Sequence, residues 1–316
     1  MNYGSFTERA DHISRCLELA VLYEVSGYPK PGNVHRTADF VGTTFEHYLA
    51  SAVAVTPSFK RAAEQGIRVS KGDICPSEVR FGQIIKNAVD KMLESQSGGN
   101  TLLGAIILLT PIASAAGMTI NGFSMFKLRE NIKVLVEATT PEDAIEVYDA
   151  IVAVKPGGLN KSKKLDVTDP TSKKKILDEG ITLLDTFKIA ASFDSVASEW
   201  VNNYPLTFDL GYPYLIKQLE ETNNLNMATV HTFLKILAEV PDTFISRKVG
   251  QLKSENVSAD AKKILKEGGL TTPLGKNLIH KLDRKLRDPI NSLSPGTTAD
   301  ITEAVLALNN LNGYKP

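Results

Sequence analysis

"TLLGAIILLTPIASAAGM", residues 101–118, is the one stretch of this 316-residue chain whose apolar run approaches the length of a membrane span. It is near the lower length limit for a span, and it contains Thr110, Pro111 and Ser114. No aromatic or basic anchors flank it, as they commonly do at membrane interfaces. We therefore predict a buried helix at the centre of a protein core, and no membrane span.

Outward from this helix, apolar residues recur at helical spacing in both directions. Ile13, Leu17 and Val21 follow one another at intervals of four, and residues 301–308 repeat the helical pattern. We find no sustained alternation of β-branched and polar residues, which would indicate strands. The sequence therefore predicts an all-α protein, a single large multi-helix bundle domain over residues 1–316, with roughly a dozen helices.

The helix boundaries follow from Ser/Thr caps with an early proline or acid, as in "TTPEDA" and "SPGTTAD". The predicted helices span residues 7–26, 42–64, 78–96, 101–117, 122–136, 141–154, 173–190, 194–202, 208–222, 226–239, 256–267, 273–287 and 298–311. The segment 157–175 carries six lysines and interrupts the helical rhythm. We interpret it as a solvated surface loop, and a basic flap over a polyphosphate is the alternative.

The composition excludes several classes of protein. Lys+Arg and Asp+Glu both number 36, so the net charge is zero, which argues against a protein that coats nucleic acid or an anionic membrane. Cys16 and Cys75 cannot form a disulfide framework, and the first residues lack the order of a secretion signal. We therefore predict a cytoplasmic protein, and we expect a homodimer because most soluble oligomers are homo-oligomers.

The stretch "EVSGYPKPGNVHR", residues 24–36, leaves a helix through a stiff loop with two prolines and two glycines. If residues 7–26 are helical, Glu24 lies on the same face as Leu17 and points toward the interior, where carboxylates are rarely unpaired. The loop then holds several polar side chains in fixed positions: Lys30, Asn33, His35 and Arg36. Such a set suits a bound phosphate together with a metal or a proton transfer. The alternative is a structural turn in which Glu24 pairs with Lys30 or Arg36.

Other candidate residues lie at predicted helix starts. In "GGNTLLG", Asn100 or Thr101 caps an apolar helix whose free N–H groups and positive dipole end could bind an anion. Asp143 follows Thr140 by three residues, and Asp300 follows Thr297 by three, so capping is the first interpretation of both acids. In "SFDSVASEW", one of Asp194 and Glu199 is expected to cap a helix.

Taken in order, these blocks resemble one protein family. "EVSGYPKPGNVHR", Asp39, "GGNTLLG", "TTPEDAIEVYDAI", "PGGL", "DSVASEW" and "SPGTTAD" are similar to the triphosphoribosyl-dephospho-CoA synthase family. The resemblance covers residues 13–200 and 294–308, whereas residues 204–290 match little. It implies an all-α enzyme that transfers the triphosphoribosyl group of ATP to the 2'-hydroxyl of 3'-dephospho-CoA and releases adenine. It also implies glycosyl transfer by one inverting displacement, through an oxocarbenium-like transition state.

The resemblance implies a division of roles among the candidate residues. A divalent ion, expected to be Mg2+, would help to grip the ATP triphosphate. The metal ligands and the base are expected among Glu24, Asp143 and Asp300, and Asp39 is expected to orient His35 or to join the metal ligands. His35 or Asn100 is expected to donate to the leaving adenine. Phosphates and base are expected to contact Lys30, Asn33, His35, Arg36, Asn100 and Thr101; Asp194 and Glu199 are second choices.

One position departs from the family pattern. Other members carry His in a "GxNTHxG" block, whereas this chain has Leu102 there. A divergent branch with another acceptor, such as a pterin-cofactor precursor, is therefore the alternative, and the acceptor pocket is expected to involve residues 204–290. A helical nucleotide-binding protein or scaffold without catalysis is the other alternative. ATP and a small-molecule acceptor are the expected partners, with no nucleic acid.

Overall fold

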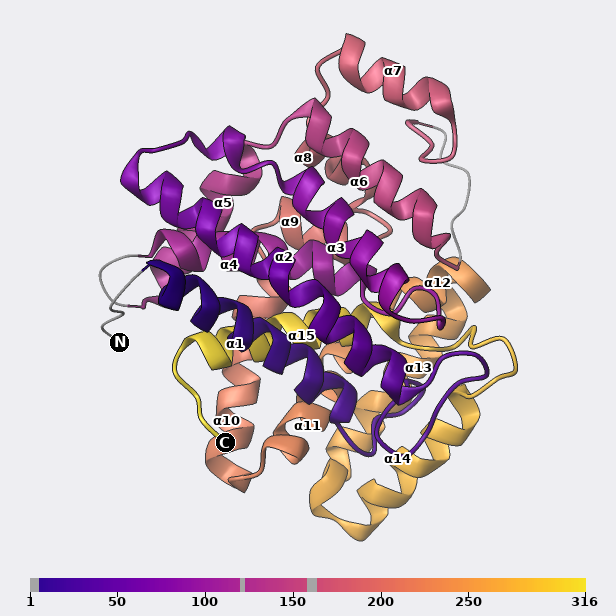
Figure 1. The fold of residues 1–316 in the computed structure, drawn as a ribbon. Helices are drawn as coiled ribbons and strands as arrows, with labels where there is room; N and C mark the ends of the chain where they lie inside the picture. Colours follow the sequence, from indigo (N-terminus) through magenta and orange to yellow (C-terminus); the bar gives the residue numbers. More distant parts are fainter. Residues whose placement is uncertain (1–5, 120–122, 158–163) are drawn as a thin grey trace.

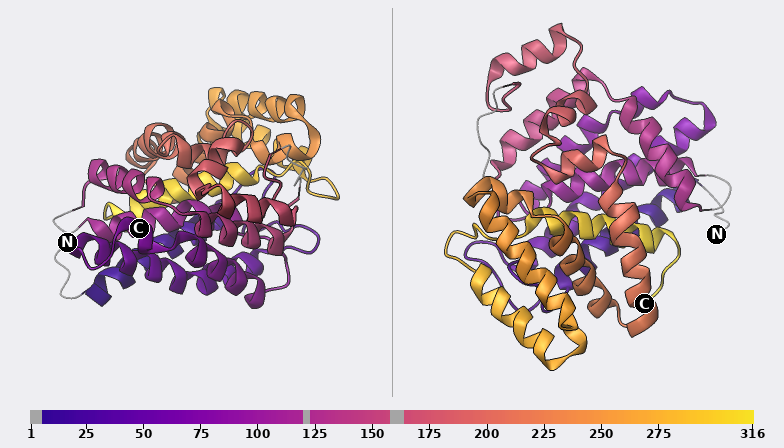
Figure 2. Two further views of the ribbon diagram at one scale, coloured as in Figure 1. Left: turned by 90° about the horizontal axis from the view of Figure 1, so that it is seen from above. Right: turned by 180° about the vertical axis from the view of Figure 1, so that it is seen from behind.

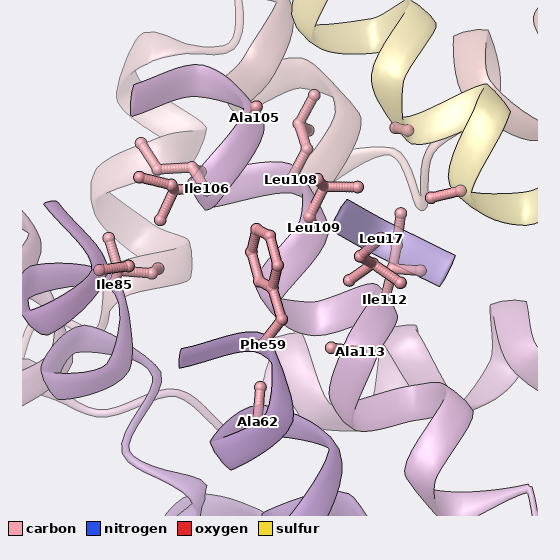
Figure 3. Packing of buried hydrophobic residues seen from close by; sticks show 14 of the residues in the cluster. Leu17, Phe59, Ala62, Ile85, Ala105, Ile106, Leu108, Leu109, Ile112 and Ala113 are labelled. Atoms are coloured by element: carbon pink, nitrogen blue, oxygen red, sulfur yellow. The ribbon is translucent and has the colours of Figure 1, made fainter. Parts of the chain in front are cut away.

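The apolar stretch forms α4, Leu103–Met118, and every residue of this helix except Gly104 and Met118 is buried. The computed structural model describes residues 6–119, 123–157 and 164–316. In it α4 packs against α2, Phe45–Lys71. Figure 3 shows the Phe59 ring of α2 directed toward α4, beside Leu109 and Ile112. The prediction of a buried central helix is therefore confirmed.

The described residues contain fifteen α-helices, and the predicted all-α fold is confirmed (Figure 1). Besides α2 and α4 they are α1 Phe6–Ser26, α3 Phe81–Ser95, α5 Met125–Glu137, α6 Pro141–Val154, α7 Pro170–Asp178, α8 Leu183–Ala190, α9 Ser195–Val201, α10 Tyr212–Thr222, α11 Leu225–Glu239, α12 Thr243–Val249, α13 Gln251–Lys266, α14 Pro273–Leu286 and α15 Gly296–Leu311. Within residues 6–119, 123–157 and 164–316, β pairing is limited to two isolated bridges in the loop between α1 and α2. No helix among the described residues is long and apolar enough to cross a membrane.

Several predicted boundaries were wrong for identifiable reasons. Helix α2 continues past residue 64 to Lys71, and it contains Pro57. The predicted helix 173–190 is two helices, α7 and α8, separated by Gly180 in the left-handed region (φ 64°). Helix α13 begins at Gln251, five residues before the predicted start at 256. Helix α12 was not predicted, since it has only seven residues and buries little besides Ile245.

Proline inside α4 explains how a neighbouring segment is attached. Pro111 lacks an N–H, so the carbonyl of Ile107 loses its usual helical partner. That carbonyl oxygen instead accepts a hydrogen bond from the indole Nε1 of Trp200 in α9, at 3.2 Å. The next carbonyl, of Leu108, accepts from the Tyr204 hydroxyl at 3.0 Å. Because of the proline, α4 has a free backbone carbonyl to which the Trp200 side chain of α9 binds.

The α2–α4 crossing is close because two glycines lie in it. A Cβ on Gly66 would lie 1.8 Å from the backbone oxygen of Ser114, and a Cβ on Gly117 would lie 2.2 Å from that of Ala63. We expect Gly66→Ala to lower the free energy of unfolding by about 1–3 kcal/mol, because the helices must separate to admit the methyl group. Urea unfolding would measure this difference.

The matched control for this substitution is Val53→Ala on the same helix. Val53 is 61% exposed, so its truncation is expected to change the free energy of unfolding by no more than about 0.5 kcal/mol. If Gly66→Ala proved as mild as Val53→Ala, the crossing would not depend on a bare backbone.

Helices α11 to α14 enclose a second, smaller apolar cluster, which includes Phe233, Ile245 and Leu282. Figures 1 and 2 show this group at one end of the molecule, beside the N-terminal half of α15. The loop between α1 and α2 and the loop before α15 meet at the same end (Figure 1). Segments distant in sequence therefore converge where the site is found.

Part of the lysine-rich segment 157–175 lies outside the described residues, including Lys161 and Lys163. Its described end forms α7, at the edge of the molecule (Figure 1). No residue of 164–175 lines the cavity described below. The structure therefore gives the alternative of a polyphosphate flap no support in the described part of that segment.

Candidate active site

A cavity of about 330 Å³ lies where α1, α4, α12 and α15 meet the two loops. Its wall includes six residues that the sequence predicted as site residues: Glu24, Lys30, Asn33, Asn100, Thr101 and Asp300. The wall also includes four residues that the sequence analysis did not name: Tyr48, Arg247, Lys248 and Glu303. Residues up to 279 positions apart in the chain thus share one cavity.

Glu24 and Lys30 form a buried ion pair on one side of the cavity. Lys30 Nζ lies 2.5 Å from Glu24 Oε1 and donates a second hydrogen bond to the Glu24 backbone oxygen at 2.9 Å. Both residues are 1% exposed. The loop after α1 therefore folds back, so that Lys30 lies against the C-terminal end of α1. The alternative of a pair between Glu24 and Lys30 is correct, and the pair also lines the cavity.

Asp300 lies on α15 and faces the N-terminus of α4. Its Oδ1 accepts a hydrogen bond from the Ala105 N–H at 3.0 Å. The capping role expected from its spacing to Thr297 was wrong, since α15 begins at Gly296 and the carboxylate crosses to another helix. Burial and the nearby Asp242 and Glu24 carboxylates raise the pKa of Asp300 well above its ordinary value.

Glu303 follows Asp300 by three residues on α15, so both carboxylates lie on one helix face. It is 2% exposed, and its Oε2 has no hydrogen-bond partner among the described residues. Burial, with the Glu24 and Asp300 carboxylates, raises its pKa well above the ordinary value. Tyr48 lines the same cavity, and burial, with the charges of the same three acids, raises its pKa too.

The basic side of the cavity comes from α12. Lys248 Nζ lies 4.1 Å from the centre of the Phe244 ring and donates to the Asn291 backbone oxygen at 2.9 Å. Arg247 forms an ion pair with Asp194. Burial lowers the pKa of Lys248, and the Asp288 and Asp242 carboxylates oppose this shift. Lys248 and Arg247 therefore bring two cationic groups to the wall of the cavity.

Two residues anchor α12 to the rest of the site. Asp194 accepts from the Val196 and Ala197 N–H groups as the N-cap of α9, as predicted for one acid of its block, and also holds Arg247. Asp242 is the N-cap of α12 and accepts from Thr298 N and Oγ1, both at 2.8 Å. These acids position the basic side chains relative to α15.

A second pair, Asp283 of α14 and Arg287 directly after that helix, fixes the loop that carries Lys30. Asp283 accepts from the Gly32 N–H at 2.9 Å and from Arg287. Arg287 in turn donates to the Asn33 backbone oxygen at 2.6 Å. The Asn33 side chain joins the loop before α15, since it donates to the Pro295 oxygen and accepts from Ser294. Residues 204–290, in which the sequence showed little family resemblance, therefore support the site through α12 and α14.

Three loop residues predicted for the site do not line the cavity. Arg36 is exposed and donates to the Ser26 backbone oxygen and to Asn226. Asp39 is exposed and accepts from the Phe45 N–H at the start of α2, rather than orienting His35. His35 is 2% exposed, and burial, with Arg287 nearby, lowers its pKa to about 4. His35 is therefore neutral near pH 7. It does not line the cavity.

Two further acids have structural roles instead. Asp143 caps α6 through Thr140 and accepts from the Gly82 N–H at 2.8 Å, which joins α3 to α6. Its predicted role as a metal ligand is not supported, because both oxygens already bind the backbone. Glu199 accepts from Leu206 and Thr207 in the π-helical turn Leu206–Gly211, and burial raises its pKa to about 7.

The position that differs from the family pattern faces the core. Leu102 is 1% exposed, and its N–H lies 3.3 Å from the Met92 sulfur. Its neighbours Thr101 and Leu103 line the cavity, whereas Leu102 does not. Asn100 accepts from the Leu103 N–H and Thr101 pairs with the Ser51 hydroxyl, so both polar residues hold the start of α4.

The amino-acid sequence matches a known protein family along almost its whole length. The sequence model of ATP:dephospho-CoA triphosphoribosyl transferase matches residues 10–316. Two Pseudomonas fluorescens proteins, each named as a candidate 2-(5''-triphosphoribosyl)-3'-dephosphocoenzyme-A synthase, are 24% and 22% identical over 294 residues. These alignments cover 92% of this chain and 88% and 89% of the relatives.

A crystal structure from Archaeoglobus fulgidus, described as a candidate triphosphoribosyl-dephospho-CoA synthase, shares the fold. Its TM-score is 0.60 at 22% identity, with 84% of this chain and 100% of that chain covered. Since the family match extends over almost the whole sequence, the chain belongs to the ATP:dephospho-CoA triphosphoribosyl transferase family and is a transferase.

Proposed function

We propose that the cavity between α1, α4, α12 and α15 is the site at which this enzyme moves the triphosphoribosyl group of ATP to dephospho-CoA and releases adenine. One observation carries the assignment: the acidic and cationic side chains that such a reaction needs line a single cavity of about 330 Å³. The acids are Glu24, Asp300 and Glu303, and the cations are Lys30, Arg247 and Lys248. Carboxylates suit a glycosyl transfer because charge at the sugar carbon becomes positive in the transition state.

The two charged sides of the cavity suggest how ATP lies in it. The sugar carbon that reacts belongs beside the three carboxylates, because they stabilise developing positive charge. The triphosphate belongs beside Arg247 and Lys248, which offer a guanidinium and an ammonium group. Phe244 lies under both cations and lines the cavity, so it presents a flat apolar surface next to them.

The start of α4 suits the ribose and the adenine better than a phosphate. Asp300 already accepts the Ala105 N–H at that helix end, so a phosphate there would meet a carboxylate. Asn100 and Thr101 line the cavity beside it and offer amide and hydroxyl groups. We assign them to the sugar or the adenine, and we assign the phosphates to α12.

A magnesium ion fits this site only together with the nucleotide. No group of three or more His, Cys, Asp or Glu side chains in residues 6–119, 123–157 and 164–316 is arranged to hold a metal ion. Mg2+ needs only one or two carboxylates when phosphate oxygens complete its shell. Asp300 fits as that ligand because its Oδ2 makes no hydrogen bond to any residue that the structure describes, whereas Glu24 is paired with Lys30. When bound, the ion would neutralise phosphate charge.

Arg247 provides a test of the orientation. We expect Arg247→Gln to weaken ATP binding about 10- to 100-fold, the loss typical for hydrogen bonds to a charged group. Titration calorimetry with ATP and Mg2+ would measure it. Arg129→Gln is the matched control, because it also breaks an ion pair, with Asp209, but does not line the cavity. Equal ATP affinity in both variants would contradict a phosphate site at α12.

The reaction itself is tested by chromatography for free adenine. Incubation with ATP, Mg2+ and dephospho-CoA is expected to release adenine in step with loss of the acceptor. A pterin-cofactor precursor serves as the competing acceptor, although the family match favours dephospho-CoA. Binding of ATP without adenine release from any acceptor would contradict the proposed function and favour a nucleotide-binding protein. The cytoplasmic location and the homodimer stay predictions.

A further inference from the structure

The three carboxylates of the cavity have different surroundings. Glu24 is held by the Lys30 ammonium group at 2.5 Å. Asp300 is held through Oδ1 by the Ala105 N–H at the start of α4. Glu303 Oε2 has no partner among the described residues, although the side chain is 2% exposed. A buried polar atom without a partner is rare, because its desolvation is not compensated.

The groups that face Glu303 come from four parts of the chain. Glu24 and Lys30 approach from α1 and its following loop, Asp300 from α15 itself, and Tyr48 from α2. The two carboxylates and burial raise the Glu303 pKa, and Lys30 opposes them. A base works best when its pKa is near the working pH, so a raised value makes Glu303 a stronger base than an ordinary carboxylate.

We propose that Glu303 is the general base of the transfer, accepting the proton of the acceptor hydroxyl through its unpartnered Oε2. This inference rests on the proposed function of the cavity. The three acids have different surroundings, and such differences give carboxylates in one site different protonation states and roles. Glu24 is neutralised by its cation, and Asp300 is bonded to the start of α4 and assigned to the magnesium ion. Glu303 keeps a buried, unpartnered oxygen for the proton.

The transfer makes one bond at C1' of the ribose and breaks one. The acceptor oxygen forms a bond to C1' of the ATP ribose, and the bond from C1' to adenine N9 breaks. The electron pair of that bond leaves on N9. Glu303 takes the hydroxyl proton, and adenine gains one proton overall, so neutral adenine leaves and the carboxylate is regenerated through solvent.

Glu303→Gln and Glu303→Ala test this role. Removing a general base is expected to lower the turnover for adenine release by about 10²- to 10⁴-fold while ATP affinity stays within about twofold. Formate added to Glu303→Ala is expected to restore part of the lost turnover, because it supplies a carboxylate in the vacated space. The wild-type rate is expected to rise with pH as Glu303 loses its proton, and Glu303→Gln is expected to lose this rise.

Stability separates a catalytic role from a structural one. A carboxyl group whose pKa is raised by folding weakens the fold at pH values above its ordinary pKa, since the folded chain disfavours the charge. Glu303→Gln is therefore expected to unfold at the same or a higher urea concentration at pH 7. A lower unfolding midpoint together with lost ATP binding would overturn the inference in favour of a structural role.

Two results distinguish failure of this inference from failure of the proposed function. Wild-type adenine release that Glu303→Gln fully retains would overturn the base assignment and leave the function intact. A wild-type protein that releases no adenine with any acceptor would overturn both.

Discussion

Replacing Lys30 by Met is expected to lower the free energy of unfolding by about 3–5 kcal/mol at pH 7. The substitution keeps a long apolar side chain but removes the ammonium group, and Glu24 then stays buried at 1% exposure without its cation. An uncompensated buried charge costs far more than the pair itself contributes. Urea unfolding of the protein without ligand would measure the difference.

Two variants make this result interpretable. Glu24→Gln combined with Lys30→Met removes both charges, so most of the lost stability is expected to return. Lys60→Met breaks another pair, which joins Lys60 of α2 to Asp11 of α1, but there the side chains are 33% and 40% exposed. This change is expected to cost no more than about 1 kcal/mol. Equal losses in Lys30→Met and Lys60→Met would contradict a dominant role for burial.

The helices were predictable where their apolar faces were long. Helices α1, α4 and α6 match the predicted ranges within about two residues, because each presents several turns of buried side chains. Helix α12 has seven residues and buries chiefly Ile245, so it has too few apolar residues for a periodic signal. Missing it also meant missing Arg247 and Lys248.

The acids show what spacing can and cannot decide. The capping-box spacing was a correct guide for Asp143, whereas at Asp300 it was misleading because the helix starts one residue before Thr297. Glu24 was found because it interrupts an apolar helix face. The same reasoning identifies Glu303, which lies between Ile301 and Val305 on a helix buried over most of its length. Glu303 was therefore predictable from the sequence.

The convergence of the two loops was beyond sequence reasoning. Gly32 and Asp283 are 251 positions apart, and nothing in either segment indicates that they bond. The same holds for Asn33 and Ser294. His35 and Arg36 were placed at the site because they share a loop with Lys30, but the loop turns their side chains elsewhere. Shared sequence position is therefore weaker evidence for a site than burial on a shared helix face.

Gly104→Ala is expected to lower turnover on the order of 10²-fold without unfolding the protein, because misplacing a reacting group by about 1 Å has that effect. A Cβ on Gly104 would lie 2.1 Å from Asp300 Oδ2 and 2.9 Å from Oδ1. The carboxylate must then move away from the Ala105 N–H, since the side chain is free to turn and the helix backbone is not. Alanine also favours a helix over glycine by about 1 kcal/mol, which offsets part of the clash.

A double-variant cycle identifies the cause of that loss. In an Asp300→Ala background the carboxylate is absent, so Gly104→Ala is expected to cause little further loss of turnover. Independent effects, in which Gly104→Ala lowers turnover equally in both backgrounds, would mean that the methyl group acts on the substrate and not through Asp300. Unchanged turnover in Gly104→Ala alone would show that the placement of Asp300 against α4 is not required. The glycine of the "GGNTLLG" block is thus explained by the space that one carboxylate, nearly 200 residues later in the chain, needs beside the start of α4.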